Sequence, residues 1–367
     1  MLVTYYSKIG MLRTYAYRVK DSSCARILEE LAKSVNIVWN FCNETQRKAV
    51  RWHRRWPTGF DLNNLSAGSS KELGLHSQTV QAVAEQYAEN LRTSKRRGLR
   101  WRGKRCLAWI PFKARGVTVV GDVVTYCRQA YRFWRSRPLE GVIKTGSFSQ
   151  DARGRWYVNF QCEVAAAEPV SAERAERAGG IDLGLKYLAT LSTGEKVGAP
   201  RFFRSLEPRL AVAQRAGKKK RARALHARIK NSRKDFLHKL STRLVMEFGM
   251  IFVGNVSSSK LAKTCMAKSV LDAGWGMLRA MLGYKAVARR VRYEVVNEAY
   301  STRTCHTCGA LSGPQGLAGL EVREWVCDGC GVSHDRDVNA ARKILRLGHQ
   351  SLSGGLPGLQ GGEDAKT

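Results

Sequence analysis

Two Cys-x-x-Cys pairs near the C-terminal end constrain this chain more than any other feature. Cys305 and Cys308 form the first pair, Cys327 and Cys330 form the second, and 18 residues separate the pairs. A glycine follows the second cysteine of each pair, as a tight thiolate knuckle requires. Four thiolates at this spacing predict a zinc ribbon, and because they fill every position around a tetrahedral ion, the zinc is expected to be structural. Any chemistry must therefore lie beside the ribbon.

The charge of the chain points to its partner. It has 63 lysines and arginines against 30 aspartates and glutamates, a formal net charge of +33. So large a charge repels itself unless a polyanion neutralises it, and nucleic acid is the expected partner. Residues 92–115 contain no acid, and residues 201–243 contain 15 cations against two acids. We expect both stretches to contact phosphates, with a solvated charged helix as the ordinary alternative for the second.

Three further features bear on location. No apolar run approaches the ~20 residues of a membrane-spanning helix, which leaves a membrane surface as the weaker alternative partner. The first residues lack the hydrophobic region of a signal peptide. The remaining cysteines show no pairing pattern, as is typical of reduced thiols: Cys24, Cys42, Cys106, Cys127, Cys162 and Cys265. We therefore expect a cytoplasmic, nucleoid-associated protein.

Hydrophobic periodicity organises the first half of the chain. Alternation predicts a strand over residues 11–20, and apolar residues at helical spacing predict helices over about 23–55 and 77–94. A loop is expected over 57–70. Between residues 117 and 164 the pattern switches to period two, which predicts a small antiparallel barrel or sheet.

Two tryptophans end the first predicted helix. Trp52 and Trp56 stand among arginines. Such a mixture suits stacking on nucleobases beside phosphate contacts, but a basic helix end with both rings in the core is an equal alternative.

In the second half, glycine-flanked apolar stretches predict buried strands around residues 181–191, 250–256 and 291–298. Asp272 is expected to cap a helix that buries Trp275. A closing helix follows the second cysteine pair, and the Gly-rich end of the chain is expected to be disordered.

Two aspartates suggest a metal-dependent nuclease, which needs carboxylates from separate elements to converge on Mg²⁺. Asp182 lies within an apolar strand, where an unpaired charge is costly unless a cation compensates it. Asp337 begins a helix directly after the ribbon, with Asn339 two residues on. On its position alone, Asp337 would equally suit a simple helix N-cap.

A family resemblance strengthens this interpretation. The chain resembles TnpB, a family of RNA-guided nucleases encoded in insertion sequences and related to small type V CRISPR effectors. The motifs that carry the resemblance span about residues 179–347: Gly180-Ile-Asp182-Leu-Gly184, a basic helical insertion, an apolar strand, Ser269 with Asp272 and Trp275, the cysteine pairs, and Asp335-Arg-Asp337-x-Asn339-Ala-Ala. The N-terminal half resembles the family more loosely.

The resemblance implies a fold and a metal site. The expected class is α+β and α/β multidomain. A RuvC-like, RNase H-type mixed sheet with an inserted zinc ribbon would follow a β-barrel wedge domain that carries an inserted helical recognition domain. An Asp, a Glu and an Asp would hold the catalytic Mg²⁺, with Asp182 matching the first and Asp337 the third.

The second carboxylate departs from the family pattern, because Gly254 stands where the family usually has Glu. Either the nuclease is inactive, or another acid has taken over. Glu298 ends the next predicted strand, and neighbouring strands lie only ~4.8 Å apart, so its side chain can lean over Gly254. Glu294 is a weaker substitute, and Glu247 lies at the wrong end of its strand. The ordinary alternative for Glu298 is a surface acid paired with an arginine.

The expected domain boundaries follow from these motifs. They are wedge strands 1–22, helical recognition domain 23–105, wedge barrel 106–166, linker 167–178, nuclease 179–303, zinc ribbon 304–332, nuclease helix 333–349 and disordered tail 350–367.

The sequence thus predicts an RNA-guided, Mg²⁺-dependent DNA endonuclease with a guide RNA and a target DNA as partners. Asp182, Glu298 and Asp337 would be both the catalytic residues and the Mg²⁺ ligands. The ribbon, lying between Glu298 and Asp337, would fix their relative placement. A nuclease-dead RNA-guided repressor, a guide-independent transposase and a plain zinc-ribbon DNA-binding protein remain as alternatives.

Overall fold

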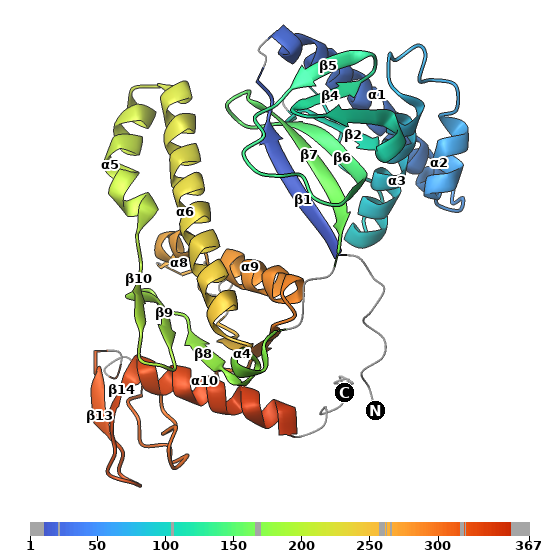
Figure 1. Cartoon of the computed structure of the whole chain (residues 1–367). Coiled ribbons are helices and arrows are strands. Elements are labelled where there is room, and N and C mark those ends of the chain that lie inside the picture. The colour runs from blue at the N-terminus through green and yellow to red at the C-terminus, as the bar shows by residue number, and fades with distance from the viewer. Residues whose placement is uncertain are drawn as a thin grey trace. The chain divides into compact units, whose positions relative to one another are not determined.

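The chain folds into two compact units, residues 1–166 and 167–367 (Figure 1). The computed structural model describes residues 11–20, 23–103, 106–165, 170–256, 261, 263–264, 266–315, 319 and 321–353. Over these residues no helix is long and apolar enough to cross a membrane. Cys265 and the end of the chain after residue 353 lie outside the described residues.

The first unit is built from two antiparallel sheets and a set of helices. Its elements are β1 (Met11–Arg18), α1 (Ser23–Arg51), α2 (Gly59–Leu65), α3 (Ser77–Ser94), β2 (Trp109–Lys113), the 3-10 turn η1 (Ala114–Gly116), β3 (Val117–Val120), β4 (Val123–Tyr126), β5 (Gln129–Arg132), β6 (Val142–Gln150) and β7 (Trp156–Val164). One sheet has the order β1-β7-β6-β2 and the other β3-β4-β5. The period-two pattern therefore predicted antiparallel strands correctly.

The helices of this unit follow their apolar stripes. The second predicted helix has the bounds expected, and Val80, Val83, Ala84, Tyr87 and Leu91 are all buried on one side of it. These residues form one core with the inward-facing residues of both sheets. A helix of this pattern is stable because packing of its apolar face offsets the entropy lost on folding.

The predicted loop over 57–70 is wrong in one respect, because α2 lies within it. Thr58 and Asp61 form a capping box: each side chain accepts a hydrogen bond from the other residue's backbone amide. Leu62 then anchors the helix in the core. A short helix with one buried anchor has too weak a period to stand out from a polar loop in sequence.

The second unit contains a five-stranded mixed sheet. Its elements are α4 (Ala172–Glu176), β8 (Ala178–Asp182), β9 (Tyr187–Leu191), β10 (Lys196–Gly198), α5 (Phe202–Arg215), α6 (Lys219–Glu247), β11 (Met250–Gly254), α8 (Ala267–Ala273), α9 (Trp275–Ala288), β12 (Arg292–Val296), β13 (Glu324–Val326), β14 (Ser333–Asp335) and α10 (Arg336–Ser353). The strand order is β10-β9-β8-β11-β12. β8, β11 and β12 run parallel, whereas β9 and β10 form antiparallel pairs.

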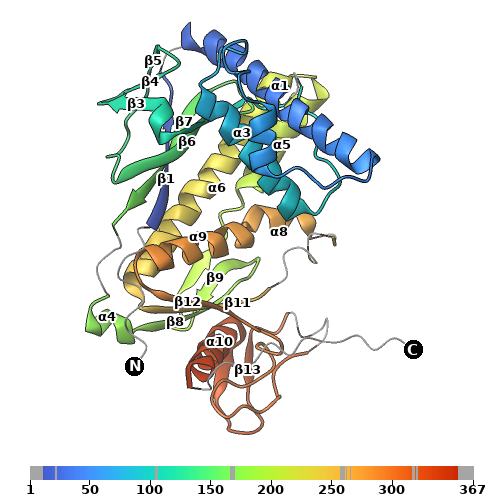
Figure 2. The same cartoon turned by 90° about the vertical axis from the view of Figure 1, so that its right-hand side faces the viewer.

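Helices cover both faces of this sheet (Figure 2). Ile181, Ile251 and Val253 join a core with α6 and α9 on one face. On the other face Phe252 and Val296 pack against Ile344 of α10. Burial on both faces explains why the parallel strands are continuous apolar runs in sequence.

Several predicted boundaries need correction. The expected linker 167–178 contains α4 and the first residue of β8. α10 runs to Ser353, past the point where the disordered tail was expected at residue 350. β12 ends at Val296, so Glu298 lies two residues beyond the strand rather than at its end.

Asp272 does not cap the helix expected after it. It lies buried within α8, and α9 begins only after Gly274, whose left-handed φ of 70° ends α8. Its carboxylate instead accepts hydrogen bonds from the Phe203 amide, at 2.9 and 3.0 Å, and from Arg233 at 2.6 Å. Asp272 therefore fixes the start of α5 and one turn of α6, a long-range role that local sequence could not indicate.

Candidate active site and zinc site

Three parallel strands of the second unit end at one edge of the sheet. β8 ends with Asp182, β11 with Gly254 and β12 with Val296. Val253 pairs with Ile181, and Gly254 pairs with Val296. Because parallel strands bring their carboxyl ends together, this edge collects the residues that follow all three strands.

Asp182 faces α10 across this edge. A side chain at Gly180 would overlap the Ala341 carbonyl and would lie 2.7 Å from the Leu345 amide, so α10 rests directly on the backbone of β8. Side chains two residues apart on a strand share a face, which directs Asp182 to the same side. The close approach explains the small residues Ala340 and Ala341, both fully buried.

Asp337 lies in the first turn of α10 but is not its cap. The cap is Asp335, whose Oδ1 accepts from the amides of Asp337 at 3.1 Å and Val338 at 3.0 Å. The alternative of Asp337 as a simple N-cap is therefore wrong. Its carboxylate lies 3.5 Å from Arg323 and keeps 19% of its side-chain surface exposed. That leaves Asp337 available for another ligand.

Glu298 occupies the space above Gly254. A Cβ built on Gly254 would overlap Glu298 Oε2 and would lie 3.1 Å from its Cδ. The Glu298 amide donates to Asn255 Oδ1 at 3.3 Å, which ties the segment after β12 to the end of β11. Oε2 of Glu298 is buried without a hydrogen-bond partner among the described residues. Burying a carboxylate oxygen without a hydrogen-bond partner costs free energy, so Oε2 is a candidate atom to bind a ligand such as a cation.

The three carboxylates influence one another. The pKa of Asp182 is raised to about 7, first by burial and then by the negative charges of Glu298 and Asp337, with Arg336 opposing them. Burial also raises the pKa of Glu298, against a hydrogen bond from the Val256 amide and the charge of Arg279. Like charges gathered in a partly buried region repel each other, and a divalent cation would remove that repulsion.

These carboxylates are more widely spaced than a single-ion cage. Over the described ranges, the four ribbon cysteines are the group of at least three ligands whose binding atoms all lie within 4.8 Å of one another. Two Mg²⁺ ions about 3.5–4 Å apart, each about 2.1 Å from its oxygens, can be spanned by carboxylates up to about 8 Å apart. Carboxylates spaced too widely for a one-ion cage can thus still be bridged by two ions.

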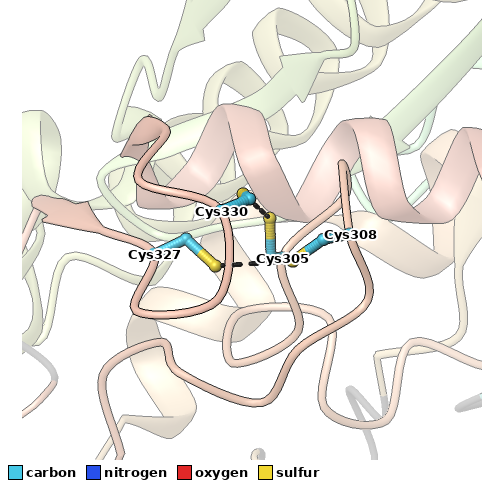
Figure 3. A group of neighbouring side chains, drawn as sticks. All are labelled: Cys305, Cys308, Cys327 and Cys330. Atoms are coloured by element: carbon cyan, nitrogen blue, oxygen red, sulfur yellow. Dashed lines mark hydrogen bonds between the residues drawn. The ribbon is translucent and has the colours of Figure 1, made fainter.

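The four cysteines of the ribbon converge as predicted, with their sulfur atoms directed toward a common point (Figure 3). The Sγ atoms of Cys305 and Cys330 are 3.7 Å apart, and those of Cys308 and Cys327 are 3.5 Å apart. Tetrahedral zinc with Zn–S bonds of about 2.3 Å places its sulfurs about 3.8 Å apart. The site therefore fits zinc and is too open for disulfides.

Polar neighbours complete this sulfur cluster. His334 Nε2 lies 3.1 Å from Cys305 Sγ, and the Ser312 hydroxyl donates to Cys327 Sγ at 3.2 Å. The bond from Ser312 is the main reason that the pKa of Cys327 is lowered to about 6. A thiol that ionises readily is the form that binds zinc.

Asn339 joins the ribbon to α10, a role that the sequence did not indicate. Its side chain is buried and donates to the carbonyls of Ser301 at 3.2 Å and Thr304 at 2.9 Å. Its Oδ1 accepts from the His306 amide at 2.9 Å. Asn339 thus holds the segment after Glu298 and the first cysteine knuckle against the helix that carries Asp337.

The predicted phosphate-contacting stretches are largely exposed. Of the 15 cations in residues 201–243, four form ion pairs with carboxylates in the described part of the chain: Arg204, Arg233, Lys239 and Arg243. The others lie exposed on α5, α6 and the turn between them. Unpaired cations at this density on one helical hairpin suit a phosphate backbone.

The tryptophans at the end of α1 are exposed, not buried. Trp52 keeps 56% of its surface accessible and Trp56 keeps 41%, so the alternative that places them in the core is wrong. Arg54 lies over the Trp52 ring, and Arg47 lies over the exposed Trp101 ring. Aromatic rings interleaved with cations are typical of surfaces that bind single strands.

Comparison with protein families gives two matches in the second half of the chain. A family model described as "Probable transposase" matches residues 160–264, which include Asp182 and Gly254. A model described as "Cas12f1-like, TNB domain" matches residues 275–344, which include Glu298, the cysteine pairs and Asp337.

Individual proteins match about three fifths of the chain. A Streptomyces pristinaespiralis protein named "Putative RNA-guided DNA endonuclease" is 44% identical over 229 residues, 58% of this chain and 55% of that protein. The "Putative RNA-guided DNA endonuclease InsQ" of Escherichia coli (strain K12) is 30% identical over 252 residues, 61% of each chain. TnpB-like protein L79 of Acanthamoeba polyphaga mimivirus is 27% identical, covering 61% of this chain and 47% of that protein. The chain thus spans about half to three fifths of these relatives.

A solved structure shares the fold across most of the chain. The cryo-EM structure of a Cas12f1-sgRNA-target DNA complex aligns with a TM-score of 0.58, covering 88% of this chain and 83% of that one at 11% identity. So low an identity supports a likeness of fold alone. The family models and the named relatives agree with one another: over about three fifths of its length this chain is similar to proteins named TnpB-like or putative RNA-guided DNA endonuclease.

Proposed function

We propose that this protein is an RNA-guided DNA endonuclease that hydrolyses DNA matched by a bound guide RNA. The observation that carries the proposal is the position of Glu298, whose carboxyl group fills the space above Gly254 at the sheet edge that also holds Asp182. The absence of a carboxylate at Gly254 and the presence of the Glu298 carboxyl group in the same space are consistent with a relocated metal ligand. The names of the relatives from Streptomyces pristinaespiralis and Escherichia coli support the same activity.

The proposal assigns roles to both units. The sheet of the second unit would be a RuvC-like nuclease over residues 179–303, with the zinc ribbon 304–332 inserted before its last helix. In the first unit, β1 and β2 belong to one sheet, while α1, α2 and α3 lie between them in the chain. That order supports a wedge domain, residues 1–22 and 106–166, with a helical recognition domain, residues 23–105, inserted into it.

Asp182, Glu298 and Asp337 would hold Mg²⁺. The unpaired Oε2 of Glu298 and the mutual repulsion of the carboxylates fit a divalent cation. When bound, the metal would supply an activated water and positive charge for the leaving oxygen. Arg279 and Arg336 act on the same region, because their charges lower the pKa values of Glu298 and Asp182. They would offset part of the effect of burial, which raises both pKa values, and so favour the ionised form that binds a metal.

The remaining residues would bind and orient the nucleic acids. Cations in residues 92–115 and 201–243 would contact phosphates, and the exposed Trp52, Trp56 and Trp101 would stack on unpaired bases. A heteroduplex would be recognised by shape, and a short adjacent duplex motif by side chains. With one carboxylate site, the two DNA strands would be cut in turn.

A cleavage assay tests the proposal. The protein is purified with its RNA and given a guide-matched target and Mg²⁺, as wild type and as Asp182→Ala, Glu298→Ala and Asp337→Ala. Each variant should lose cleavage. Glu294→Ala is the matched control, because Glu294 accepts from Ser351 away from the sheet edge and should not be needed.

A double variant tests the relocation of the glutamate. Gly254→Glu alone should lose cleavage, because its side chain would overlap Glu298. Combined with Glu298→Ala, Gly254→Glu should restore cleavage, since its carboxyl group would then occupy the space that Glu298 has left. If Glu298→Ala cuts at the wild-type rate, the relocated site is wrong. If wild type binds RNA and target but never cuts, the protein is a guided repressor. If no RNA is recovered with the protein, the proposal that it is RNA-guided is wrong.

A further inference from the structure

A pocket of about 670 Å³ opens on the first unit, which contains neither the three carboxylates nor the ribbon. The segment before α3, the 3-10 turn η1 and the β3-β4-β5 sheet surround it. Its lining consists of Ser70, Lys71, Gly74, Leu75, His76, Arg115, Gly116, Val117, Thr118, Thr125, Tyr126, Cys127 and Arg128. This volume lies within the range of about 300–1,000 Å³ that is typical of small-ligand sites.

The charge of the pocket favours an anion. Lys71, Arg115 and Arg128 line it, no acidic residue does, and none of the three forms an ion pair within the described ranges. His76, the N-cap of the 18-residue helix α3, also lines the pocket, so the positive end of the helix adds to the field. Cations that converge in a concavity reinforce each other more than cations spread over a convex surface.

A strained turn places Arg128 at the pocket. Cys127 and Arg128 form the two-residue connection between β4 and β5, with φ values of 48° and 61°. Such hairpin turns favour Asn and Gly, because other side chains are strained in the left-handed region. Backbone strain at a ligand-facing turn is a recurrent feature of binding sites.

The floor of the pocket is rigid and largely apolar. Leu75 and Tyr126 are buried, and the Tyr126 hydroxyl lies 2.7 Å from Thr79 Oγ1 of α3, which fastens the sheet to the helix. Beside it, Gln78 Oε1 is buried without a partner in the described chain and lies 3.6 Å from the Cβ position of Gly116. Buried side chains shared by the sheet and the helix therefore close the floor of the pocket.

We infer that this pocket binds one unpaired nucleotide of a bound nucleic-acid strand. The phosphate would lie against Lys71, Arg115 and Arg128, and the base would lie within the pocket above the buried Leu75 and Tyr126. The inference rests on the proposed function for the presence of a strand, but not for cleavage.

The test measures the affinity of the full-length protein for synthetic single-stranded RNA and DNA at several salt concentrations. In Arg115→Ala/Arg128→Ala, the slope of log affinity against log salt should fall by up to about 0.7, since the pocket holds one phosphate and each phosphate contact contributes about 0.7. The matched control is Arg18→Ala/Arg26→Ala, which removes two exposed cations outside the pocket and should leave the slope near that of wild type.

A second variant fills the pocket without changing charge. A Cβ on Gly116 meets its nearest neighbour, His76 Nδ1, at an ordinary 3.4 Å, so the fold accommodates an added Cβ. Gly116→Leu should weaken binding about tenfold with an unchanged slope, because the base is excluded from the pocket while the cations remain, and Gly116→Ala should weaken it less. Loss for RNA alone or for DNA alone identifies the strand that is held.

Two results would overturn the inference: equal slopes for the pocket and control pairs, or wild-type binding by Gly116→Leu. Cleavage by the wild type is measured in parallel. Binding that depends on the pocket in a protein that never cuts would overturn the proposed activity while supporting the pocket.

Discussion

The zinc site and the carboxylate site both border the first turns of α10, yet the chain builds them in opposite ways. The zinc ligands come from two tight turns, so each pair is positioned by its own few residues. Asp182, Glu298 and Asp337 come from three elements far apart in sequence and meet only when the sheet forms. A locally built site tolerates change elsewhere in the fold, whereas a site assembled from afar depends on every contact that sets its geometry.

The sharpest test of this difference is Asp182→Asn. We expect cleavage to fall by roughly 1,000-fold or more, since several kcal/mol of transition-state stabilisation depend on the metal. The free energy of unfolding, in contrast, should rise in this variant. A pKa raised from 3.8 to about 7 means that folded Asp182 holds its proton where the unfolded residue has lost it. Without metal, the free energy of unfolding therefore falls as pH rises between these values.

Thermal unfolding in a chelator-containing buffer checks this prediction. The decline of stability with rising pH should be smaller in Asp182→Asn than in the wild type, and Mg²⁺ should stabilise only the wild type. A variant less stable than wild type at neutral pH would show that Asp182 is a structural residue.

The next effect concerns the local site. Cys308→Ser should lose zinc, and because the ribbon connects Glu298 to Asp337, cleavage should fall by roughly 10- to 100-fold, as is common when residues that support a metal site are lost. Metal analysis and the cleavage assay measure both. A folded Cys308→Ser protein that cuts normally would show that the two sites are independent.

The same contrast explains what could be predicted from sequence. The cysteine ligands and the helix over residues 77–94 depend on spacing alone, and the structure agrees with both. The apolar strand around Asp182 and the position of Asp337 after the ribbon pointed to both aspartates, and the family resemblance strengthened the interpretation; their role as metal ligands is still a proposal. Strand adjacency suggested Glu298, and the structure brings its carboxyl group above Gly254.

Long-range contacts were beyond the reach of the sequence. Asp272 is of a residue type that often caps helices, but its partners Phe203 and Arg233 lie far away in the chain. Asn339 is one polar residue in an apolar helix face, and its three backbone partners belong to another segment. Helical period and capping rules describe neighbours within a few residues, so such side chains become interpretable only with the fold.

Asn339→Ala separates the link between the sites from the sites themselves. It leaves the His306 amide and the Ser301 and Thr304 carbonyls without their partner, at a cost of about 1–3 kcal/mol. We expect zinc to be retained, because no cysteine is touched, and cleavage to fall by roughly tenfold, since small displacements of reacting groups are costly. Zinc loss equal to that of Cys308→Ser would place Asn339 in the ribbon fold instead.

The smallest expected effect comes from the ion pair between the sites. Arg323 of the ribbon lies 3.5 Å from Asp337, and its side chain keeps 44% of its surface exposed. Exposed pairs contribute about 0–1 kcal/mol, so Arg323→Ala should change cleavage by less than about threefold. The direct comparison is with Asn339→Ala in the same assay. If Arg323→Ala proves the more damaging, then charge across the gap, rather than the buried hydrogen bonds of Asn339, couples the zinc ribbon to the carboxylates.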